Sequence, residues 1–461
     1  MINPTVFKAY DIRGVYPTEL NEGSCEIIIK SIAHFFKSKL KKDDITIVLG
    51  RDMRISSPSL FETARRTLVA EGITVVDIAL APTPTFYFAV LKYKYDAGIC
   101  ITASHNPKEY AGIKFVLRDG SKIIKIGKLT GMDEIKALAM KGEFPQSPGG
   151  GQVIKRDDVL DDEIEEAAAQ IDISKIKPFK VACDPANGMG ALYVKKLFEK
   201  VGAELITMNF DLDGTFPAHP ADPLDYKNLE PLQDKLKEVG ADLGIEPDGD
   251  GDRVFFIDEE AHVIPATLIT SLIAREALQD HPGAKIIVDV RYTRNVENAV
   301  RKYGGEPIIS RVGHAFITED VNRRDAYFAG ESSGHFYFGQ TGGAESAVRV
   351  ILYVLKAMSE ENKPISKIVE ELRTSEESGE YNFIADDPDR IITAVKDSYK
   401  DGHLSELDGI AVSYEDWRFS IRASNTEPLL RLNVEGKSEE LTKLKLEELT
   451  KKILEAGAKE K

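Results

Sequence analysis

Short apolar runs alternate with longer amphipathic stretches along most of the chain. The runs at 45–52, 179–188 and 285–293 are rich in Val and Ile and stop at acidic, Gly or Pro residues, which is typical of buried strands. A stretch with helical periodicity follows each run and ends at a glycine, a common C-terminal signal of helices. This alternation predicts parallel strand–helix–strand units with right-handed crossovers.

The third apolar run of each unit leads directly into a polar loop. These segments are 97–107, 241–253 and 326–335. Ligands of open parallel sheets bind beyond the carboxyl ends of the strands. We therefore expect the three loops to take equivalent places in three similar domains and to surround one cleft.

The pattern changes near residue 370, where shorter strands and a charged final helix follow a polar stretch. The prediction is an α/β protein with three similar mixed-sheet α/β domains plus a smaller C-terminal α+β domain around one central cleft. A Pro- and Gly-rich stretch at 141–158 marks the first expected linker. The expected domains are 1–150, 151–256, 257–370 and 371–461. Each of the first three carries one of the polar loops.

Composition narrows the range of partners. The 461 residues include 60 Lys and Arg against 76 Asp and Glu, a formal net charge of −16, which argues against nucleic-acid or membrane-surface binding. No apolar run is long enough to span a membrane, and the N-terminus lacks a secretory pattern. Three scattered cysteines (Cys25, Cys100 and Cys183) are expected to be reduced core residues. We expect a cytoplasmic protein.

The first polar loop, 102–107, places Ser104 at a strand end before Pro107. Ser104 is a candidate nucleophile or phosphate carrier. A simple turn that closes the strand explains this hexapeptide equally well.

The second loop carries Asp248, Asp250 and Asp252, separated by glycines. Carboxylates in this spacing can converge on Mg²⁺ or Ca²⁺. An EF-hand is rejected because Arg253 takes the place of the required glycine and the flanks are predicted strands. Arg253 indicates that an anion, such as a phosphoryl group, also approaches the metal.

The third loop, 330–335, has Glu, Ser and His side chains able to bind sugar hydroxyls, although a plain surface turn explains this loop better when it is taken alone. The segment 422–428, followed by Arg431, combines two arginines with small donors and predicts a phosphate site. Arg13 and Lys114 add local positive charge for an anionic substrate.

Together the motifs AYDIRG, TASHNP, DGDGDR, GESSGH and RASNTEP resemble the α-D-phosphohexomutase superfamily, the phosphomannomutase/phosphoglucomutase group, in order and spacing. The resemblance covers nearly the whole chain. It implies a phosphoserine at Ser104, supported by His105, and one Mg²⁺ held by Ser104 and the three aspartates. Arg253 would lie nearby, and Lys114, Arg13 and His335 are implied candidates for proton transfer. The implied substrate contacts are Tyr10, Arg291, His314, Glu331, Ser333, Arg422, Ser424, Asn425, Thr426 and Arg431.

The resemblance implies a mutase that interconverts hexose 1-phosphate and hexose 6-phosphate of mannose and/or glucose. A hexose 1,6-bisphosphate is the implied intermediate, and glucose 1,6-bisphosphate or an equivalent the activator. The chain departs from the family with Arg291, where Lys is frequent, and with 341–345, where an Asp-Gly pair is usual. Phosphoglucosamine mutase is the alternative within the family. A phosphate monoester hydrolase and a non-catalytic sugar-phosphate sensor are alternatives of other classes, and the oligomeric state, monomer or dimer, stays open.

Overall fold

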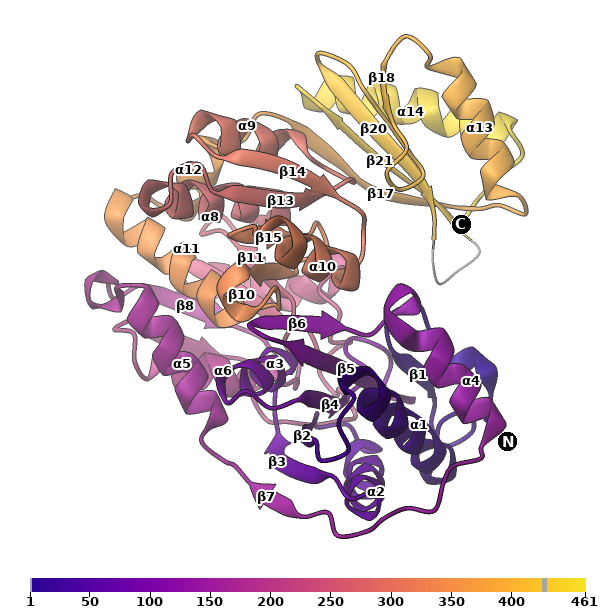
Figure 1. Ribbon diagram of the computed structural model, residues 1–461. Helices are drawn as coiled ribbons and strands as arrows, with labels where there is room; N and C mark the ends of the chain where they lie inside the picture. Colours follow the sequence, from indigo (N-terminus) through magenta and orange to yellow (C-terminus); the bar gives the residue numbers. More distant parts are fainter. Residues whose placement is uncertain (1, 425–428) are drawn as a thin grey trace. The chain divides into compact units, whose positions relative to one another are not determined.

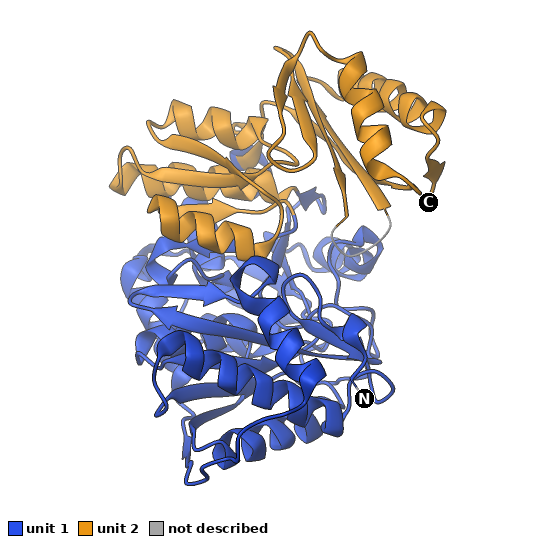
Figure 2. Ribbon diagram, turned by 45° about the vertical axis from the view of Figure 1, so that its right-hand side comes forward, with its two compact units in different colours: residues 1–264, 333–368 blue, residues 265–332, 369–461 orange. Residues whose placement is uncertain are grey.

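The computed structural model describes residues 2–424 and 429–461 (Figure 1). The chain divides into two compact units, which Figure 2 colours separately. Unit 1 comprises residues 1–264 and 333–368, and unit 2 comprises residues 265–332 and 369–461. The chain therefore leaves unit 1 after Ile264, returns after Ser332 and leaves again after Ile368.

The first sheet of unit 1 is mixed. Its strand order is β1-β5-β4-β2-β3-β7, with β6 paired to β5. β2 is parallel to β3 and β4, whereas β5 is antiparallel to β4 and β1. β7 pairs with β3, so this sheet continues into the expected linker and past residue 150. The elements are η1 (Pro4–Val6), β1 (Ile12–Val15), α1 (Glu22–Leu40), β2 (Thr46–Arg51), α2 (Ser57–Ala70), β3 (Thr74–Leu80), α3 (Thr83–Lys92), β4 (Ala97–Ile101), β5 (Tyr110–Asp119), β6 (Lys122–Lys125), η2 (Lys128–Met132), α4 (Asp133–Lys141) and β7 (Val153–Lys155).

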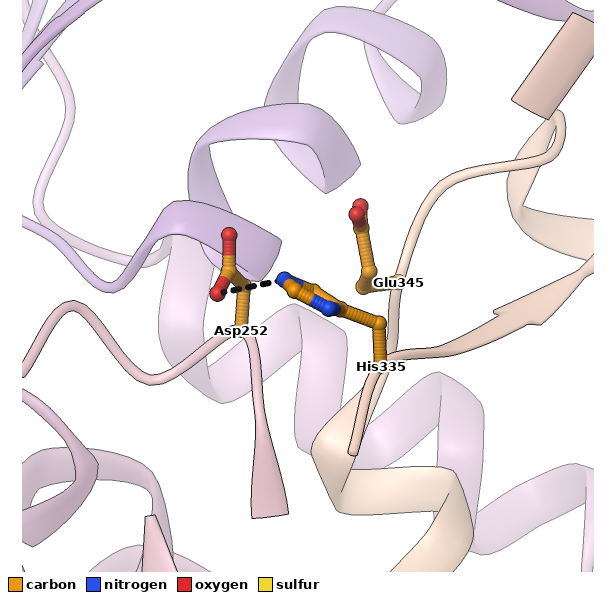
Figure 3. Close-up of side chains that lie close together, drawn as sticks. All are labelled: Asp252, His335 and Glu345. Carbon is orange, nitrogen blue, oxygen red and sulfur yellow. Dashed lines mark ion pairs between the residues drawn. The ribbon is translucent and has the colours of Figure 1, made fainter. Parts of the chain in front are cut away.

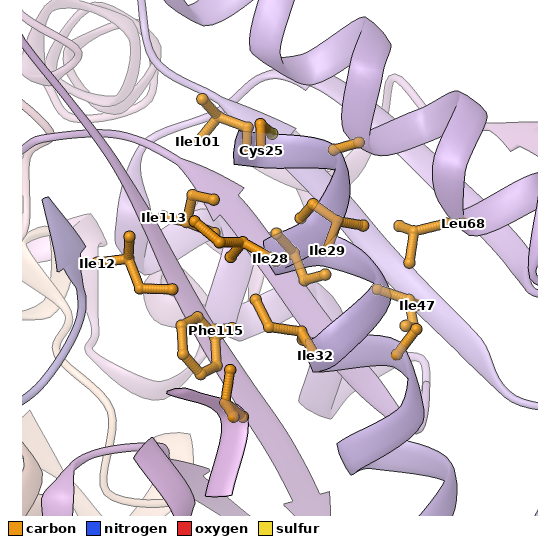
Figure 4. Close-up of a cluster of buried hydrophobic side chains, with 14 of the residues drawn as sticks. Ile12, Cys25, Ile28, Ile29, Ile32, Ile47, Leu68, Ile101, Ile113 and Phe115 are labelled. Atoms are coloured by element: carbon orange, nitrogen blue, oxygen red, sulfur yellow. The ribbon is translucent and has the colours of Figure 1, made fainter. Parts of the chain in front are cut away.

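Helix α1 covers one face of this sheet (Figure 4). It begins at a capping box, in which the Asn21 side chain accepts from the N–H of Ser24 and the Ser24 hydroxyl accepts from the N–H of Asn21. Its buried face, including Ile28 and Ile32, packs in one cluster with strand residues such as Phe115. This apolar core makes the sheet a rigid base for the loops at its edge.

The second sheet of unit 1 has the order β12-β11-β10-β8-β9. β8 is parallel to β9 and β10, whereas β10 and β11 form an antiparallel hairpin. The segment that returns after Ser332 adds helices to the same unit. The elements are α5 (Val159–Gln170), η3 (Ile173–Lys175), β8 (Lys180–Cys183), α6 (Gly190–Phe198), β9 (Glu204–Thr207), η4 (Tyr226–Leu229), α7 (Glu230–Val239), β10 (Leu243–Pro247), β11 (Val254–Ile257), β12 (Val263–Ile264), β16 (Phe336–Phe338), η5 (Gly339–Thr341), α11 (Ala347–Glu361) and α12 (Ile365–Glu370).

Unit 2 contains a third parallel arrangement, in which β13 lies between β14 and β15. It also contains a six-stranded sheet in the order β18-β19-β20-β21-β17-β22, in which the pairings described are antiparallel. Helices α13 and α14 supply apolar residues to the core of this sheet. The elements are α8 (Ala266–Asp280), β13 (Lys285–Asp289), α9 (Arg294–Lys302), β14 (Glu306–Ser310), α10 (His314–Arg324), β15 (Phe328–Gly330), β17 (Glu376–Ile384), α13 (Pro388–Ser398), β18 (His403–Ser405), β19 (Ile410–Ser413), β20 (Trp417–Ala423), β21 (Leu429–Gly436), α14 (Glu439–Glu455) and β22 (Lys459–Glu460).

The predicted fold class is confirmed: three α/β portions precede a smaller C-terminal α+β portion. The three cysteines are buried and unpaired, as expected. Among the described residues, no helix has both the length and the apolar character needed to cross a membrane. The expected domain boundaries and the shared cleft stay predictions.

Candidate functional site

Ser104 lies in the loop after β4 and is buried. Its φ of +53° is uncommon for a residue that has a side chain. Its N–H donates to Oγ1 of Thr102 across 3.0 Å. Its Oγ lies 3.1 Å from Nδ1 of His105 and donates to Oδ2 of Asp248, also across 3.1 Å. The hydroxyl is therefore held between an imidazole nitrogen and a carboxylate that comes from a different sheet.

Asp248, Asp250 and Asp252 lie in the tight turn that joins β10 to β11. Pro247 is opposite Val254 in this hairpin, so the turn folds back sharply. The three carboxylates are buried, and one oxygen from each lies within 4.8 Å of the others. Since strands flank the turn on both sides, the prediction that it is not an EF-hand is confirmed.

Two buried cations offset part of this negative charge. Nζ of Lys114 lies 2.7 Å from Oδ2 of Asp250 and 2.6 Å from Oδ2 of Asp252. Nε of Arg253 donates to Oδ2 of Asp248 across 3.0 Å. Lys114 reaches the cluster because its strand β5 runs antiparallel to β4, which places it opposite Cys100 near the end of that strand.

Burial and the neighbouring charges shift the pKa values of several of these groups. Burial raises the pKa of Asp248 to about 6, although Arg253 opposes this. Burial also acts to raise the pKa of Asp252, but Lys114 and His335 outweigh it and hold that pKa well below its usual range. Burial lowers the pKa of His105 well below its usual range, with Arg253 adding to the effect. The His105 ring is therefore neutral at neutral pH and able to accept a hydrogen bond.

The carboxylate cluster fits a hard divalent cation. Oδ1 of Asp250 is buried and accepts no hydrogen bond from the part of the chain that the structure describes, and Oδ1 of Asp252, also buried, has Nε2 of His335 at 3.4 Å. Buried carboxylate oxygens are costly unless a donor or a cation meets them. Oxygen ligands of this kind are those that Mg²⁺ and Ca²⁺ prefer. The three aspartates can therefore hold a metal ion next to the Ser104 hydroxyl.

His335 lies beside the acidic turn, together with a residue that the sequence did not single out as functional, Glu345 (Figure 3). Nε2 of His335 is 3.4 Å from Oδ1 of Asp252. Oγ of Ser333 lies 2.9 Å from Nδ1 of the same ring. The backbone at His335 bridges to Arg253, so the third loop is fastened to the acidic turn. Ser333, His335 and the aspartates are thus brought together in unit 1.

Arg13 lies on β1 and contacts the first loop through Oδ1 of Asn106. Its Nε also donates to Oδ2 of Asp11 across 2.7 Å. Tyr10 is half-buried and precedes the same strand. Arg13 therefore lies at the edge of the Ser104 loop.

In unit 2, Glu331 and Arg291 contact each other. Nη2 of Arg291 donates to Oε1 of Glu331 across 3.2 Å, and its Nε donates to Oδ1 of Asp289 across 2.9 Å. The N–H of Gly313, which precedes His314 at the start of α10, also donates to Oε1 of Glu331, across 3.1 Å. These predicted substrate contacts therefore form one cluster in this unit.

Arg422 on β20 and Arg431 on β21 are cross-strand partners. Both contact Glu380 on β17: Nη2 of Arg422 lies 3.4 Å and Nη1 of Arg431 3.0 Å from its carboxylate oxygens. Burial lowers the pKa of Arg422, and Arg291 adds to this effect. Ser424 follows β20, and its N–H donates to the carbonyl of Leu429 across 2.8 Å. The predicted residues Asn425 and Thr426 lie outside the described residues.

Sequence reasoning missed three charged residues of these clusters: Arg54, Glu345 and Glu380. Arg54 donates through its guanidinium to the backbone carbonyl of Ser104 across 2.7 Å. The missed side chains contact residues remote in the sequence, so no local pattern marked their roles.

Comparison with known proteins matches the chain to one family. The three phosphoglucomutase/phosphomannomutase alpha/beta/alpha domains I, II and III match residues 4–143, 162–261 and 267–375, and the C-terminal domain of the same family matches 380–452. A phosphomannomutase of Methanocaldococcus jannaschii is 38% identical, with 98% of each chain covered. A phosphomannomutase of Vibrio cholerae serotype O1 is also 38% identical, over 97% of this chain and 98% of the relative.

Solved structures agree with this result. A phosphoglucomutase/phosphomannomutase family protein of Burkholderia thailandensis has a TM-score of 0.89 and 30% sequence identity, and the match covers 100% of both chains. A phosphomannomutase structure from Thermus thermophilus, titled putative, has a TM-score of 0.81 at 21% identity, covering 98% of this chain and 99% of that one, a likeness of fold. The chain therefore belongs to the phosphoglucomutase/phosphomannomutase family and is a mutase of that family.

Proposed function

We propose that this mutase interconverts the 1-phosphate and 6-phosphate of mannose and/or glucose, with Ser104 as the phosphoryl carrier. The observation that supports this proposal most directly is the position of the Ser104 hydroxyl. Its Oγ lies 3.1 Å from both Nδ1 of His105 and Oδ2 of Asp248, at the cluster of three buried carboxylates. A phosphoryl group on this oxygen would lie near the cations Lys114 and Arg253, and a divalent cation at the three aspartates would supply the further positive charge that a transferring phosphate needs.

The reaction proceeds in two transfers that balance each other. In the first, a sugar hydroxyl oxygen loses its proton to a base and forms a bond to the phosphorus of phosphoserine, the bond from phosphorus to the Ser104 oxygen breaks, and the Ser104 oxygen takes up a proton. The product is a hexose 1,6-bisphosphate. The intermediate then reorients, and in the second transfer the Ser104 oxygen loses its proton to a base and forms a bond to the other phosphorus. The bond from that phosphorus to the sugar oxygen breaks, and the sugar oxygen takes up a proton, which gives the isomeric monophosphate. Lys114, Arg13 and His335 are the candidates for moving the proton, and glucose 1,6-bisphosphate is the expected activator.

The metal proposed for the acidic turn is one Mg²⁺, held by Asp248, Asp250, Asp252 and the Ser104 phosphoryl oxygen. When bound, it supplies Lewis-acid stabilisation of the charge on the transferring phosphoryl group. The chain's own part is to hold its ligands rigidly: the N–H groups of Gly251 and Arg253 both donate to Oδ1 of Asp248 across 3.1 Å. This orients the carboxylate without a change in its charge.

Recognition of the sugar is assigned to Glu331 and Ser333, with Arg291, His314 and Tyr10 as further contacts. The phosphate that does not react is assigned to Arg422, Ser424, Asn425, Thr426 and Arg431. The adjacent positions of Arg422 and Arg431 support this assignment, because two guanidinium groups can bind one phosphate through several charge-assisted hydrogen bonds. Glu380 forms ion pairs with both guanidinium groups, so a bound phosphate would have to share them with this carboxylate.

Mannose phosphate is the first substrate to test, because the two curated relatives above are phosphomannomutases. A coupled assay with Mg²⁺ and a trace of glucose 1,6-bisphosphate compares mannose 1-phosphate, glucose 1-phosphate and glucosamine 1-phosphate. We expect turnover of the first two, lowered by orders of magnitude in Ser104→Ala. Turnover of the glucosamine compound alone would instead indicate phosphoglucosamine mutase, and release of free phosphate equal to turnover would indicate a hydrolase.

A further inference from the structure

Arg54 is a fully buried arginine in the turn between β2 and α2. Its guanidinium donates to four backbone carbonyls: three belong to the Ser104 loop, and the fourth is that of Tyr110, the first residue of β5. The donor–acceptor distances are 2.7 Å to Ser104, 2.5 Å to Asn106, 2.8 Å to Pro107 and 3.2 Å to Tyr110. Arg54 is thus the common hydrogen-bond donor of this loop.

Arg54 is itself held from several sides. Oδ2 of Asp52 lies 3.3 Å from its Nε, and Oδ1 of Asp52 accepts from the Arg54 N–H across 3.0 Å. The guanidinium lies 5.0 Å from the ring centroid of Phe216. The backbone of Gly214 packs so closely that a Cβ there would be 2.6 Å from Cα of Arg54. The side chain is therefore a fixed part of the interior, supported by two different segments of unit 1.

Four carbonyls that converge on one point need a donor of matching shape. Their partial negative charges repel one another, and each is costly to bury without a partner. The planar guanidinium offers several N–H groups in a fixed fork, whereas a lysine ammonium offers three donors at one point. Lysine would therefore keep the positive charge but lose part of this hydrogen bonding.

We call the four hydrogen bonds from the Arg54 guanidinium the Arg54 clamp, and this clamp acts on a strained backbone. Ser104 has a φ of +53°, and such a conformation in a residue with a side chain persists only where its surroundings enforce it. In a trans peptide, the N–H lies opposite the carbonyl. With the Ser104 carbonyl on Arg54, the N–H of His105 is directed away from the guanidinium, and it donates to no acceptor within the described ranges 2–424 and 429–461.

We propose that Arg54 is a positioning residue for phosphoryl transfer. By donating hydrogen bonds to four carbonyls between Ser104 and Tyr110, it holds the Ser104 oxygen in its reactive orientation. It also leaves the N–H of His105 available to an oxygen of the phosphoryl group. Arg54 acts through the loop and does not itself contact the phosphate. This inference rests on the proposed role of Ser104 as phosphoryl carrier.

The test compares Arg54→Lys with the wild-type enzyme and with Arg65→Lys on α2. Arg65 is a matched control because it is partly exposed and pairs with Glu62 across 2.6 Å, away from this loop. We expect Arg54→Lys to lower kcat by about 100-fold with KM within about threefold, since small misplacement of a reacting group has an effect of this order. Arg65→Lys is expected to keep both constants. A kcat of Arg54→Lys within about threefold of wild type would overturn the proposal.

Two further readouts separate positioning from general stability. Amide hydrogen exchange in residues 103–110 is expected to accelerate in Arg54→Lys and not in Arg65→Lys, while the core of the first sheet keeps its protection. Added guanidinium at millimolar concentration is expected to raise the kcat of Arg54→Ala at least about tenfold, since it can re-enter the vacated site, and to leave Ser104→Ala inactive. If Arg54→Ala does not fold, Arg54→Lys carries the test alone.

The exchange measurement also separates this inference from the proposed function. If the wild-type enzyme turned over none of the hexose phosphates, the proposed substrate would be wrong, but faster exchange in 103–110 would still support the clamp. Unchanged exchange in Arg54→Lys would overturn the clamp whatever the substrate.

Discussion

Lys125 and Glu345 form an ion pair in which the two side chains are only 2% and 1% exposed. Nζ of Lys125 also lies 4.9 Å and 5.2 Å from the ring centroids of Tyr87 and Tyr337. Burial lowers the pKa of Lys125 even though Glu345 opposes the shift. The pair joins β6 to the segment before α11, and the backbone at Glu345 bridges to Tyr337, close to His335.

Lys125→Met is expected to lower the free energy of unfolding by about 3–5 kcal/mol, because it leaves the Glu345 carboxylate buried without its partner. The double variant Lys125→Met, Glu345→Leu should recover most of this loss, since two apolar side chains leave no buried charge. Equilibrium urea denaturation measures both. The control is Lys39→Met, whose pair with Glu134 is 42% and 59% exposed and which should cost less than about 1 kcal/mol. An equal cost for Lys125→Met and Lys39→Met would show that the buried pair does not contribute as argued.

Mg²⁺ is expected to stabilise the protein by about 2.7 kcal/mol at a concentration of 100 times its Kd, because the folded chain alone assembles the three aspartates. Asp250→Asn should raise the Kd for Mg²⁺ by about an order of magnitude or more, since it removes one anionic ligand. Thermal unfolding at increasing Mg²⁺ measures the shift. Asp234→Asn, on the exposed face of α7, serves as the control and should bind Mg²⁺ as the wild type does. Wild-type affinity in Asp250→Asn would contradict the proposed metal site.

Gly249→Ala is expected to lower kcat by about 10- to 100-fold. A Cβ at Gly249 would lie 2.5 Å from the carbonyl oxygen of Ser104, so the acidic turn and the Ser104 loop could not keep their present approach. Steady-state kinetics test this, with Gly202→Ala as the control, because a Cβ there meets nothing within 4 Å. Unchanged turnover in Gly249→Ala would mean that the close approach of the two loops is not needed.

Glu163 is expected to contribute a fall in the stability of the protein as pH rises from about 4.5 to about 7. Burial raises the pKa of Glu163 to about 7, although Thr85, which donates to its carboxylate across 2.5 Å, opposes the shift. The folded chain therefore holds a proton in this window that the unfolded chain has lost, and the ionised carboxylate destabilises the fold at higher pH by about 3 kcal/mol.

Glu163→Gln should remove this contribution: near pH 8 the variant should be more stable than the wild type, and near pH 4.5 the two should be similar. Urea denaturation at both values measures the difference. Glu165→Gln is the control, because that side chain is 64% exposed. If the variant showed no gain at pH 8, Glu163 would have to be ionised at little cost in the folded chain.

Much of the site could be predicted from local pattern. Apolar runs that end in polar loops placed Ser104 and the acidic triplet at strand ends, and strands of parallel sheets present their carboxyl ends at one edge. The hydroxyl and Asp248 are 144 residues apart in the chain, yet they meet in unit 1 as the motif order implied. The rejection of an EF-hand likewise needed only Arg253 and the predicted strands on both sides of the turn.

The sequence by itself therefore determined the strand–helix alternation, the fold class and the loops that carry the chemistry, because hydrophobic periodicity and turn residues act over a few neighbouring positions. Only the tertiary structure decided which charges are buried and what compensates them. Arg54 is one of many arginines until four carbonyls converge on it, and Lys125 and Glu345 are 220 residues apart. Burial and ion pairing depend on the packing of distant segments, and no local pattern of residues encodes that packing.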